Sequence, residues 1–196
     1  LNNDETFTSA TVTDALDSRL TYVAGSSVLK VGAITLVDGT DYNVTGNAVW
    51  TLTDQGRAIL DEHMGETLTI EFKTTVNSIG NGVIPNETYS SAFNGTTVPG
   101  ETTPYSYWGK LSILKQDDSQ NNLAGAEFQV FDTQVDGSCL AAAPTTGSLA
   151  TGVSNNTGVV QWNNVTPANQ LGLWIENVND GPADPTPTRD YCVYET

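Results

Sequence analysis

The chain of 196 residues has 23 acidic residues against 7 basic ones, and its formal net charge is −16. This charge excludes nucleic acid as a partner, because phosphate binding needs clustered Lys and Arg, and it disfavours an anionic membrane surface for the same reason. No apolar run reaches the ~18 residues of a membrane-spanning helix. With 38% hydrophobic and only 15% charged residues, the composition indicates a folded protein. The length allows two domains of about 100 residues each.

The two cysteines, Cys139 and Cys192, are an even count that favours one disulfide in an exported protein. The alternative, a metal site, needs more ligands than two thiols and a single histidine supply. We therefore expect no metal and no cofactor. The chain starts at Leu1 without Met or a signal peptide and ends at Thr196 within an apparent strand, so we expect an internal fragment of a longer protein.

The first half of the chain, residues 5–94, is expected to form strand after strand, separated by Gly, Asp and Asn turn residues. In the first strand, around "ATVTD", the period of two places Asp14 on the same inward face as Ala10 and Val12. Further strands are expected at residues 19–31, 34–46, 47–52 and 66–77.

One helix interrupts these strands, in the segment "LTDQGRAILDEHMG". Thr53 has the residue type and place of an N-cap, and Gly65 supplies a C-terminal stop. Between these two residues, Ile59, Leu60 and His63 recur at helical spacing.

The second half begins after a connector. Residues 99–108, "PGETTPYSYW", combine Pro, Gly and Thr with aromatic residues, which is typical of a short stiff linker between domains. Five more strands are then expected, at residues 110–117, 125–132, 158–165, 171–178 and 190–196. The spacing predicts an all-β protein of two tandem Ig-like β-sandwiches, residues 1–103 and 104–196, with one short helix in the first.

Two ionisable residues of the second half fall on inward faces. Lys115 shares a face with Leu111 and Ile113 in its strand, and Glu195 shares a face with Tyr191 and Val193 in the last strand. A buried lysine and a buried glutamate are costly unless they are paired. Desolvation favours a neutral amine beside a neutral acid, which is a nucleophile next to a proton donor. The alternative is an ordinary salt bridge.

Conventional enzyme sites are scarce. His63 is the only imidazole and is expected to end the helix, and no HExxH, P-loop or GxGxxG sequence occurs. The acid-rich turns "QDDSQNN" and "VNDGPAD" lack the spacing of an EF-hand, so solvated turns are favoured over Ca²⁺ sites. The four tryptophans allow a sugar-binding surface as an alternative to their usual role as core or interface anchors.

Two motifs of the second half carry a family resemblance. "YWGKLSILKQDDSQNNLAGAEFQVFD" is similar to the opening of a CnaB domain, in which a lysine strand precedes an L-x-G-A-x-F strand. "YCVYET" is similar to the pilin E-box, with Glu195 as its glutamate. Through both motifs, in this order, the chain resembles the SpaA-type backbone (major) pilins of Gram-positive bacteria. The Cys139 and Cys192 pair resembles the disulfide that some of these domains carry.

The first half resembles a CnaA domain, through "VTDALDSRLTYVAGS", "DGTDYNVTG", "WTLTDQGRAIL" and "VIPNETY" in that order. In such domains an Asn side chain is joined to a Lys amine by an intramolecular isopeptide bond with the help of an Asp. The resemblance implies Asn86 as the acceptor and Asp14 as the assisting acid, with Asp4 as an alternative. The lysine is expected upstream of Leu1, because Lys30 and Lys73 are poor substitutes.

In the CnaB half the resemblance implies that neutral Lys115 attacks an asparagine carboxamide while Glu195 assists. That asparagine is expected downstream of Thr196. The reaction happens once per molecule and needs no cofactor, so the protein is not expected to be an enzyme in the turnover sense.

The resemblance implies a structural subunit of a sortase-assembled pilus, extracellular and anchored to the cell wall. Its partners would be other pilin subunits, linked by sortase, and host-surface receptors. The alternative is a surface adhesin or stalk protein that binds host protein or glycan.

Overall fold

The computed structural model describes residues 6–179 and 188–196 and divides into two compact units. Of the described residues, unit 1 comprises 6–80, 84–105 and 178–179, and unit 2 comprises 81–83, 106–177 and 188–196. Each unit has its own hydrophobic core. The prediction of an all-β protein of Ig-like sandwiches with one short helix is confirmed.

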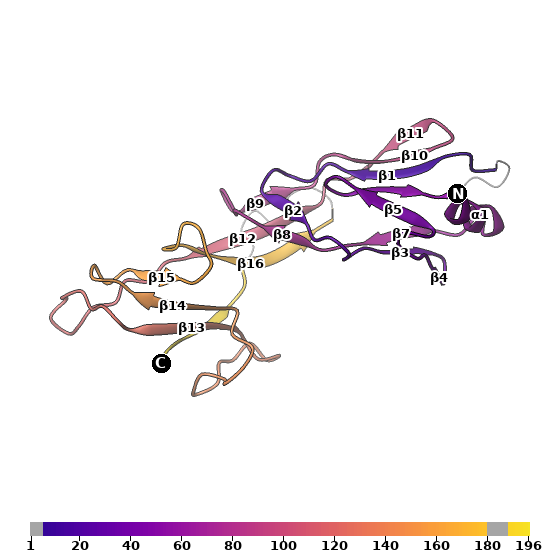
Figure 1. Ribbon diagram of the computed structural model, residues 1–196. Coiled ribbons are helices and arrows are strands. Elements are labelled where there is room, and N and C mark those ends of the chain that lie inside the picture. The colour runs from indigo at the N-terminus through magenta and orange to yellow at the C-terminus, as the bar shows by residue number, and fades with distance from the viewer. Residues whose placement is uncertain (1–5, 180–187) are drawn as a thin grey trace. The chain divides into compact units, whose positions relative to one another are not determined.

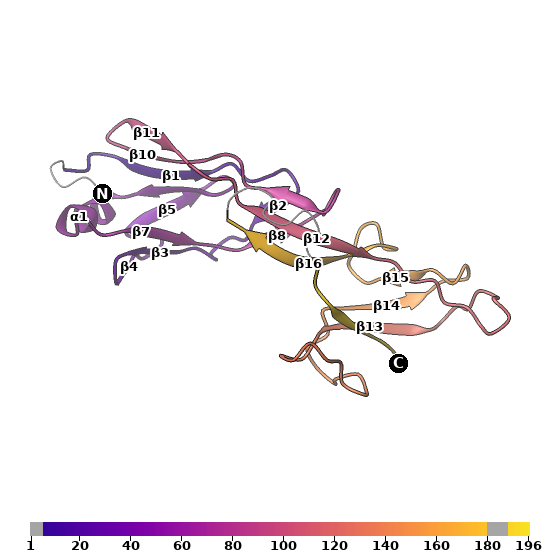
Figure 2. The ribbon, with the colours of Figure 1, turned by 180° about the vertical axis from the view of Figure 1, so that it is seen from behind.

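Unit 1 is a sandwich of two main sheets (Figures 1 and 2). A five-stranded sheet runs in the order β11-β10-β1-β6-β5, a three-stranded sheet runs β4-β3-β7, and β2 pairs with β8. The strands are β1 (Ala10–Asp14), β2 (Leu20–Tyr22), β3 (Val28–Val31), β4 (Ile34–Thr35), β5 (Tyr42–Thr45), β6 (Val49–Leu52), β7 (Leu68–Glu71), β8 (Thr74–Val76), β10 (Tyr89–Phe93) and β11 (Thr96–Pro99).

The alternation in β1 and β6 explains the core of unit 1. Ala10 and Asp14, at the two ends of β1, are buried. On β6, Trp50 and Leu52 are each 1% exposed. Leu29 of β3 faces them from the other sheet, so the two layers enclose one apolar interior.

The helix α1 (Asp54–Glu62) forms where the sequence predicts it, between β6 and β7. Thr53 is the N-cap, and its hydroxyl accepts a hydrogen bond from the Gly56 backbone N–H at 3.3 Å. Leu60 lies in the core of unit 1, and His63 is the C-cap residue.

The single strand expected over residues 66–77 is wrong, because two strands of different sheets occupy that segment. β7 pairs with β3, whereas β8 pairs with β2. The chain changes sheets at Lys73, whose backbone N–H donates to the Ser26 hydroxyl at 3.0 Å. A side-chain partner thus replaces a ladder partner at the break.

Unit 2 contains the four-stranded sheet β15-β14-β13-β17, and its strands β16 and β12 are neighbours in a second sheet. The bounds are β12 (Tyr105–Leu111), β13 (Glu127–Asp132), β14 (Ala150–Ser154), β15 (Val160–Trp162), β16 (Leu171–Val178) and β17 (Tyr191–Glu195). The short strand β9 (Val83–Pro85) lies where the chain passes from one unit to the other, with Ile84 and Pro85 in unit 1. The core is built on Phe128, Val130, Val160, Trp162 and Leu171.

The connector expected over residues 99–108 differs from the structure at both ends. Pro99 ends β11, and Gly100 donates its backbone N–H to the Tyr89 carbonyl at 2.7 Å. Residues 105–108 belong to β12, where Tyr107 is 6% exposed. The aromatic residues of this segment therefore form part of a strand.

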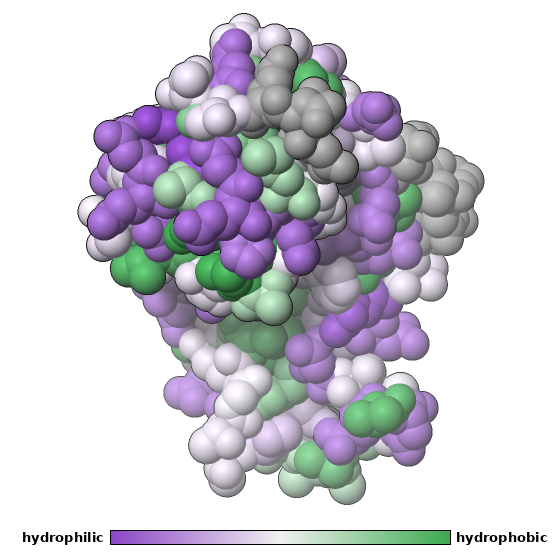
Figure 3. All heavy atoms as spheres, turned by 90° about the vertical axis from the view of Figure 1, so that its right-hand side faces the viewer, coloured by the Kyte–Doolittle hydropathy of each residue, from purple (hydrophilic) through white to green (hydrophobic). Residues whose placement is uncertain are grey.

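The surface at the α1 end of unit 1 is mainly hydrophilic, with hydrophobic residues in small groups (Figure 3). Among the described residues, the exposed large hydrophobic side chains are all Val, Ile, Leu or Met, and none is aromatic. No helix within residues 6–179 and 188–196 is long and apolar enough to cross a membrane.

Candidate functional site: two acid-paired side chains

In unit 2 the structure brings Lys115 and Glu195 together. The Lys115 amine donates to the Glu195 Oε2 at 2.8 Å, across 80 positions of sequence. Leu111 and Ile113 pack against the core of the unit, and Lys115 is the next residue in the same alternation. The pair thus joins the segment that follows β12 to the end of β17.

The backbone at Lys115 is fixed by a turn that sequence analysis missed. Its N–H donates to the Gly158 carbonyl at 2.8 Å, and its carbonyl accepts from the Leu123 N–H at 3.0 Å. Gly158 has φ of +76°, and a Cβ there would lie 2.5 Å from the Lys115 carbonyl oxygen. Only glycine fits this position without a shift of the backbone. The signal in the sequence was the turn "NNTG" that ends in this glycine.

Asn155 closes that turn. Its Oδ1 accepts hydrogen bonds from the Thr157 N–H at 2.9 Å and from the Val159 N–H at 3.1 Å. A side chain that bonds its own backbone two residues on is the usual way in which Asn stabilises a turn. Asn155 therefore supports Lys115 indirectly, through the position of Gly158.

Glu195 lies on a strand that has one neighbouring strand among the described residues. In the sheet order, β17 is the edge strand beside β13, with Glu195 opposite Phe128 and Thr196 donating its N–H to the Glu127 carbonyl at 3.0 Å. The side chain of Glu195 is 47% exposed and that of Lys115 is 26% exposed. The expected burial of both groups is therefore not found, because no described strand covers the free edge of β17.

The disulfide expected between Cys139 and Cys192 is present. The two Cα atoms are 5.6 Å apart and the bond spans 53 positions. Cys192 lies within β17, three residues before Glu195, and is 2% exposed. Cys139 belongs to the loop that follows β13. The bond fastens this loop to the strand that carries Glu195.

In unit 1 the structure brings Asp14 and Asn86 together. The Asn86 Nδ2 donates to the Asp14 Oδ2 at 2.9 Å, and the Asn86 backbone N–H donates to the Pro104 carbonyl at 2.8 Å. Asp14 ends β1, opposite Tyr89 of β10. Asn86 directly follows β9, so the amide and the acid meet where these segments adjoin.

The Asp14–Asn86 pair retains two acceptor atoms without partners. Asp14 Oδ1 and Asn86 Oδ1 are both buried and accept no hydrogen bond from the described residues. Burial raises the pKa of Asp14 above its usual value, against a smaller opposing effect of the Asn86 hydrogen bond. In its protonated form, Asp14 can donate a hydrogen bond to a neighbouring oxygen. A further donor beside these two buried oxygens would remove the energetic cost of leaving them without partners.

An open cleft of about 820 Å³ lies beside Asp14 within unit 1. One wall comes from β1, β10 and residues 98–102, and the other comes from residues 65–72. Its apolar lining includes Trp50, Ile70 and Phe72, and its acidic residues are Asp14, Glu66 and Glu101. The cleft is therefore suited to an apolar segment that carries a basic group.

The lysines of unit 1 do not take that place. Lys73 is exposed, and Lys30 lies in β3, paired with Thr69 of β7. The described contacts of the Asn86 side chain include Asp14 and no lysine amine. Asp4, the alternative assisting acid, lies outside the described residues.

Other candidates from the sequence have structural roles. Trp50 and Trp162 are core residues, 1% and 2% exposed. Asp117, in the turn "QDDSQNN", accepts from the Asn121 backbone N–H at 2.8 Å, and the Asn121 side-chain amide lowers its pKa. The turn "VNDGPAD" lies largely outside the described residues. In the described part of the chain, no group of three or more His, Cys, Asp or Glu could hold a metal ion.

Comparison with known proteins shows which solved structures share this fold. No protein-family model and no curated protein matches the chain. Solved major pilins of Gram-positive bacteria share its fold over the full length of the chain. The resemblance to major pilins is thus confirmed for the fold.

Three of these structures show the extent of the likeness. Domains D2 and D3 of the major pilin SpaD from Corynebacterium diphtheriae match with a TM-score of 0.71 and 23% identity, over all of this chain and 72% of that one. The Actinomyces fimbrial adhesin FimA matches with a TM-score of 0.66 and 21% identity, over all of this chain and 77% of that one. The C. diphtheriae major pilin SpaA matches with a TM-score of 0.64 and 17% identity, and this chain spans 52% of it.

Proposed function

We propose that this chain is part of a structural subunit of a pilus, stabilised by one self-formed Lys–Asn isopeptide bond in each unit. The observation that carries the proposal is that an acid is paired with a group able to form such a bond in both units. Glu195 contacts the Lys115 amine at 2.8 Å, and Asp14 contacts the Asn86 amide at 2.9 Å. The pilin fold of the chain, and the isopeptide bonds named for the major pilin SpaA, support it.

In the proposed reaction a neutral lysine amine attacks the carbonyl carbon of an asparagine carboxamide. The new C–N bond replaces the bond to the amide nitrogen, which leaves as ammonia, and the acid relays the protons. Fixed geometry supplies most of the rate, because well-oriented groups reach effective molarities of roughly 10⁵ M or more. In unit 2 the asparagine, and in unit 1 the lysine, are proposed to lie outside these 196 residues.

The two units offer different starting points. In unit 1 the acceptor Asn86 already accompanies a buried acid, and the adjacent cleft has the size and lining for a segment that brings the amine. In unit 2 the Lys115–Glu195 pair is half-exposed, and a further segment beside it would exclude water from both groups. We propose the assignment of residues 1–103 and 104–196 to a CnaA-like and a CnaB-like domain on this basis.

The intact mass of the full-length protein, after reduction of its disulfide, tests the proposal. Each bond is expected to lower the mass by roughly 17 Da, one ammonia. Lys115→Ala or Glu195→Ala should abolish the deficit of unit 2, and Asn86→Ala or Asp14→Ala that of unit 1. The exposed Lys110→Ala serves as the matched control and should keep both deficits. A native mass equal to the sequence mass contradicts the proposal.

Extracellular location, anchoring to the cell wall and sortase linkage to other subunits follow as parts of the same proposal. The adhesin alternative would be favoured by an exposed aromatic patch. No exposed large hydrophobic residue of the described part is aromatic. The pilus subunit is therefore the function that the chain supports best.

A further inference from the structure

Strand β17 presents Glu195 on one face and is anchored through the other. Glu195 lies opposite Phe128, a core residue of unit 2, so its side chain is on the face toward that core. Cys192 lies opposite Phe131, and the alternation of a strand places Cys192 and Tyr194 on the reverse face. The two faces of the same short strand thus serve different purposes.

The reverse face is held by the segment Ser138–Leu140, which we name the loop clamp. Cys139 of the clamp forms the disulfide with Cys192, and the Tyr194 hydroxyl donates to the Leu140 carbonyl at 2.9 Å. The Tyr194 ring also packs edge-on against Phe131 at 5.7 Å between centroids. The clamp therefore contacts β17 at two successive positions of one face.

A tight turn over residues 134–138 leads into the clamp. The Gln134 N–H donates to the Ser138 carbonyl at 2.8 Å, and the Ser138 hydroxyl donates to the Asp136 Oδ1 at 2.7 Å. These bonds close the loop directly before Cys139. This closed turn restricts the positions that Cys139 can take. Through the disulfide, it therefore also restricts the position of Cys192 in β17.

Glu195 needs such support more than Lys115 does. The Lys115 backbone is bonded on both sides, to Gly158 and to Leu123. β17 has β13 alone as its described neighbour, and Val193 at its centre is 42% exposed. An edge strand of five residues with one ladder is free to shift unless its other contacts hold it.

We propose that Cys139, Cys192 and Tyr194 are positioning residues, which hold the Glu195 carboxylate within reach of the Lys115 amine. They touch neither reacting group and act through the placement of β17. Where it concerns the rate of bond formation, this inference rests on the proposed function. The geometry of the Lys115–Glu195 pair is testable without it.

The first test uses the 196-residue chain, in which the Lys115 amine is paired with Glu195 and has not reacted. It measures the reactivity of Lys115 by brief acetylation with acetic anhydride, followed by mass spectrometry of the peptides. The hydrogen bond to the Glu195 carboxylate holds the Lys115 amine and limits its access to the reagent, so the paired amine reacts slowly. In the Cys139→Ser/Cys192→Ser variant, acetylation of Lys115 should rise roughly threefold or more, as expected for loss of a part-exposed ion pair. Lys110, exposed in the same unit, should be unchanged. Equal labelling of Lys115 in the native and variant proteins overturns the proposal.

Two further variants separate positioning from loss of stability. Tyr194→Phe keeps the ring and the disulfide and removes the bond to Leu140, so labelling of Lys115 should rise by a smaller factor than in the cysteine variant. Leu171→Ala removes a core side chain of β16 and leaves the clamp intact. It should leave the labelling of Lys115 at the native level. A rise in Leu171→Ala as large as in the cysteine variant would mean that general destabilisation is the cause.

The second test follows mass loss in full-length protein that is isolated in denaturant before the bond has formed and is then allowed to fold. If the clamp positions Glu195, the cysteine variant should lose the ammonia of unit 2 roughly tenfold more slowly, the order expected for misplaced reacting groups. Equal rates in native and variant overturn the positioning role. Absence of any mass loss in the native protein contradicts the proposed function instead, and the acetylation result then still decides the positioning.

Discussion

At the scale of single residues, Asp14 is unusual because it is a buried carboxyl with one unpartnered oxygen. Its side chain is 7% exposed, Oδ2 accepts from Asn86, and Oδ1 has no partner among the described residues. Most buried side-chain oxygens in folded proteins have a hydrogen-bond partner, so an unpartnered carboxylate oxygen needs an explanation. We interpret the unpartnered atom as the cost of an arrangement that serves a reaction.

This interpretation predicts how stability depends on pH. Burial raises the pKa of Asp14 in the folded state, so folding favours its protonated form. As pH rises from the unfolded value near 4 through the folded pKa, the free energy of unfolding falls. Asp14→Asn removes this titration and should raise the melting temperature of unit 1 at pH 7, with a gain that shrinks below about pH 4.

Thermal melts at both pH values, followed by circular dichroism, check this prediction. Glu87→Gln, an exposed position near Asn86 in the chain, is the control and should change neither melt. A lower melting temperature of Asp14→Asn at pH 7 would show that the carboxylate stabilises the fold and would contradict the interpretation.

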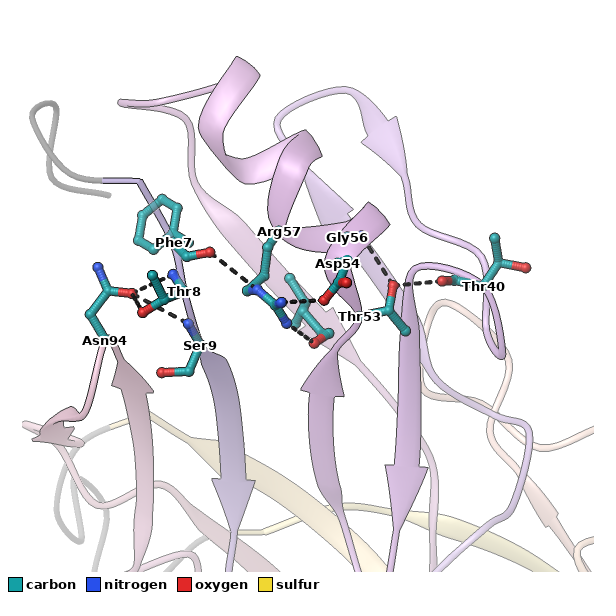
Figure 4. Close-up of polar contacts among 10 residues, drawn as sticks. Phe7, Thr8, Ser9, Thr40, Thr53, Asp54, Gly56, Arg57 and Asn94 are labelled. Atoms are coloured by element: carbon teal, nitrogen blue, oxygen red, sulfur yellow. Dashed lines mark hydrogen bonds and ion pairs between the residues drawn. The ribbon is translucent and has the colours of Figure 1, made fainter.

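At the scale of elements, the turn between β10 and β11 fastens the start of β1 (Figure 4). Asn94 has φ of +50°, and its Oδ1 accepts from the Thr8 N–H at 2.7 Å and from the Ser9 N–H at 3.3 Å. Its Nδ2 donates to the Thr6 carbonyl at 3.0 Å. From the other side, the Arg57 guanidinium of α1 donates to the Phe7 carbonyl at 3.1 Å.

Loss of the Asn94 amide should therefore weaken unit 1. Asn94→Ala is expected to lower the free energy of unfolding by about 1–3 kcal/mol. The Thr8 and Ser9 backbone N–H groups lose their acceptor, and alanine tolerates the positive φ of this position less well than asparagine does. Asn94→Asp keeps the acceptor and should cost less. Urea denaturation of both variants measures the difference. Equal stability of Asn94→Ala and the native protein would show that solvent replaces these bonds.

A similar argument applies to β14 in unit 2. A Cβ at Gly152 would lie 2.7 Å from Val160 Cγ1 and 2.9 Å from the Gln161 carbonyl oxygen. Gly152→Ala should thus overpack the core and cost about 1–3 kcal/mol in urea denaturation. Val153→Ala, on the exposed face of the same strand, should cost less than about 0.5 kcal/mol. A reversed order of the two variants would contradict this packing.

The sequence predicted those parts of the site that alternation controls. The period of two placed Asp14 and Lys115 on the faces that carry core residues of their units. The strand β14 was missed, since Gly152 and the buried Ser154 break its apolar pattern. The exposure of Glu195 also escaped prediction, because it depends on the place of β17 at the sheet edge, which long-range pairing decides.

At the scale of the whole molecule, the two separate cores predict two thermal transitions. Trp50 lies in the core of unit 1, and the disulfide lies in unit 2. Trp50→Ala should reduce the free energy of unfolding of unit 1 by about 3–5 kcal/mol, so in calorimetry the melting temperature of one transition should fall. Removal of the disulfide should reduce the free energy of unfolding of unit 2 by about 2–5 kcal/mol and lower the melting temperature of the other transition. If each variant shifted both transitions equally, the units would unfold as one.

We expect Lys115 and Asn86 each to enter a covalent bond in the full-length protein. Tandem mass spectrometry of its protease digest tests this most directly. We expect one peptide that contains Lys115 joined to an asparagine-bearing peptide, and one that contains Asn86 joined to a lysine-bearing peptide, each lighter by about 17 Da than the sum of its parts. Recovery of both peptides unlinked and at full mass, from protein purified in its native state, would contradict the account.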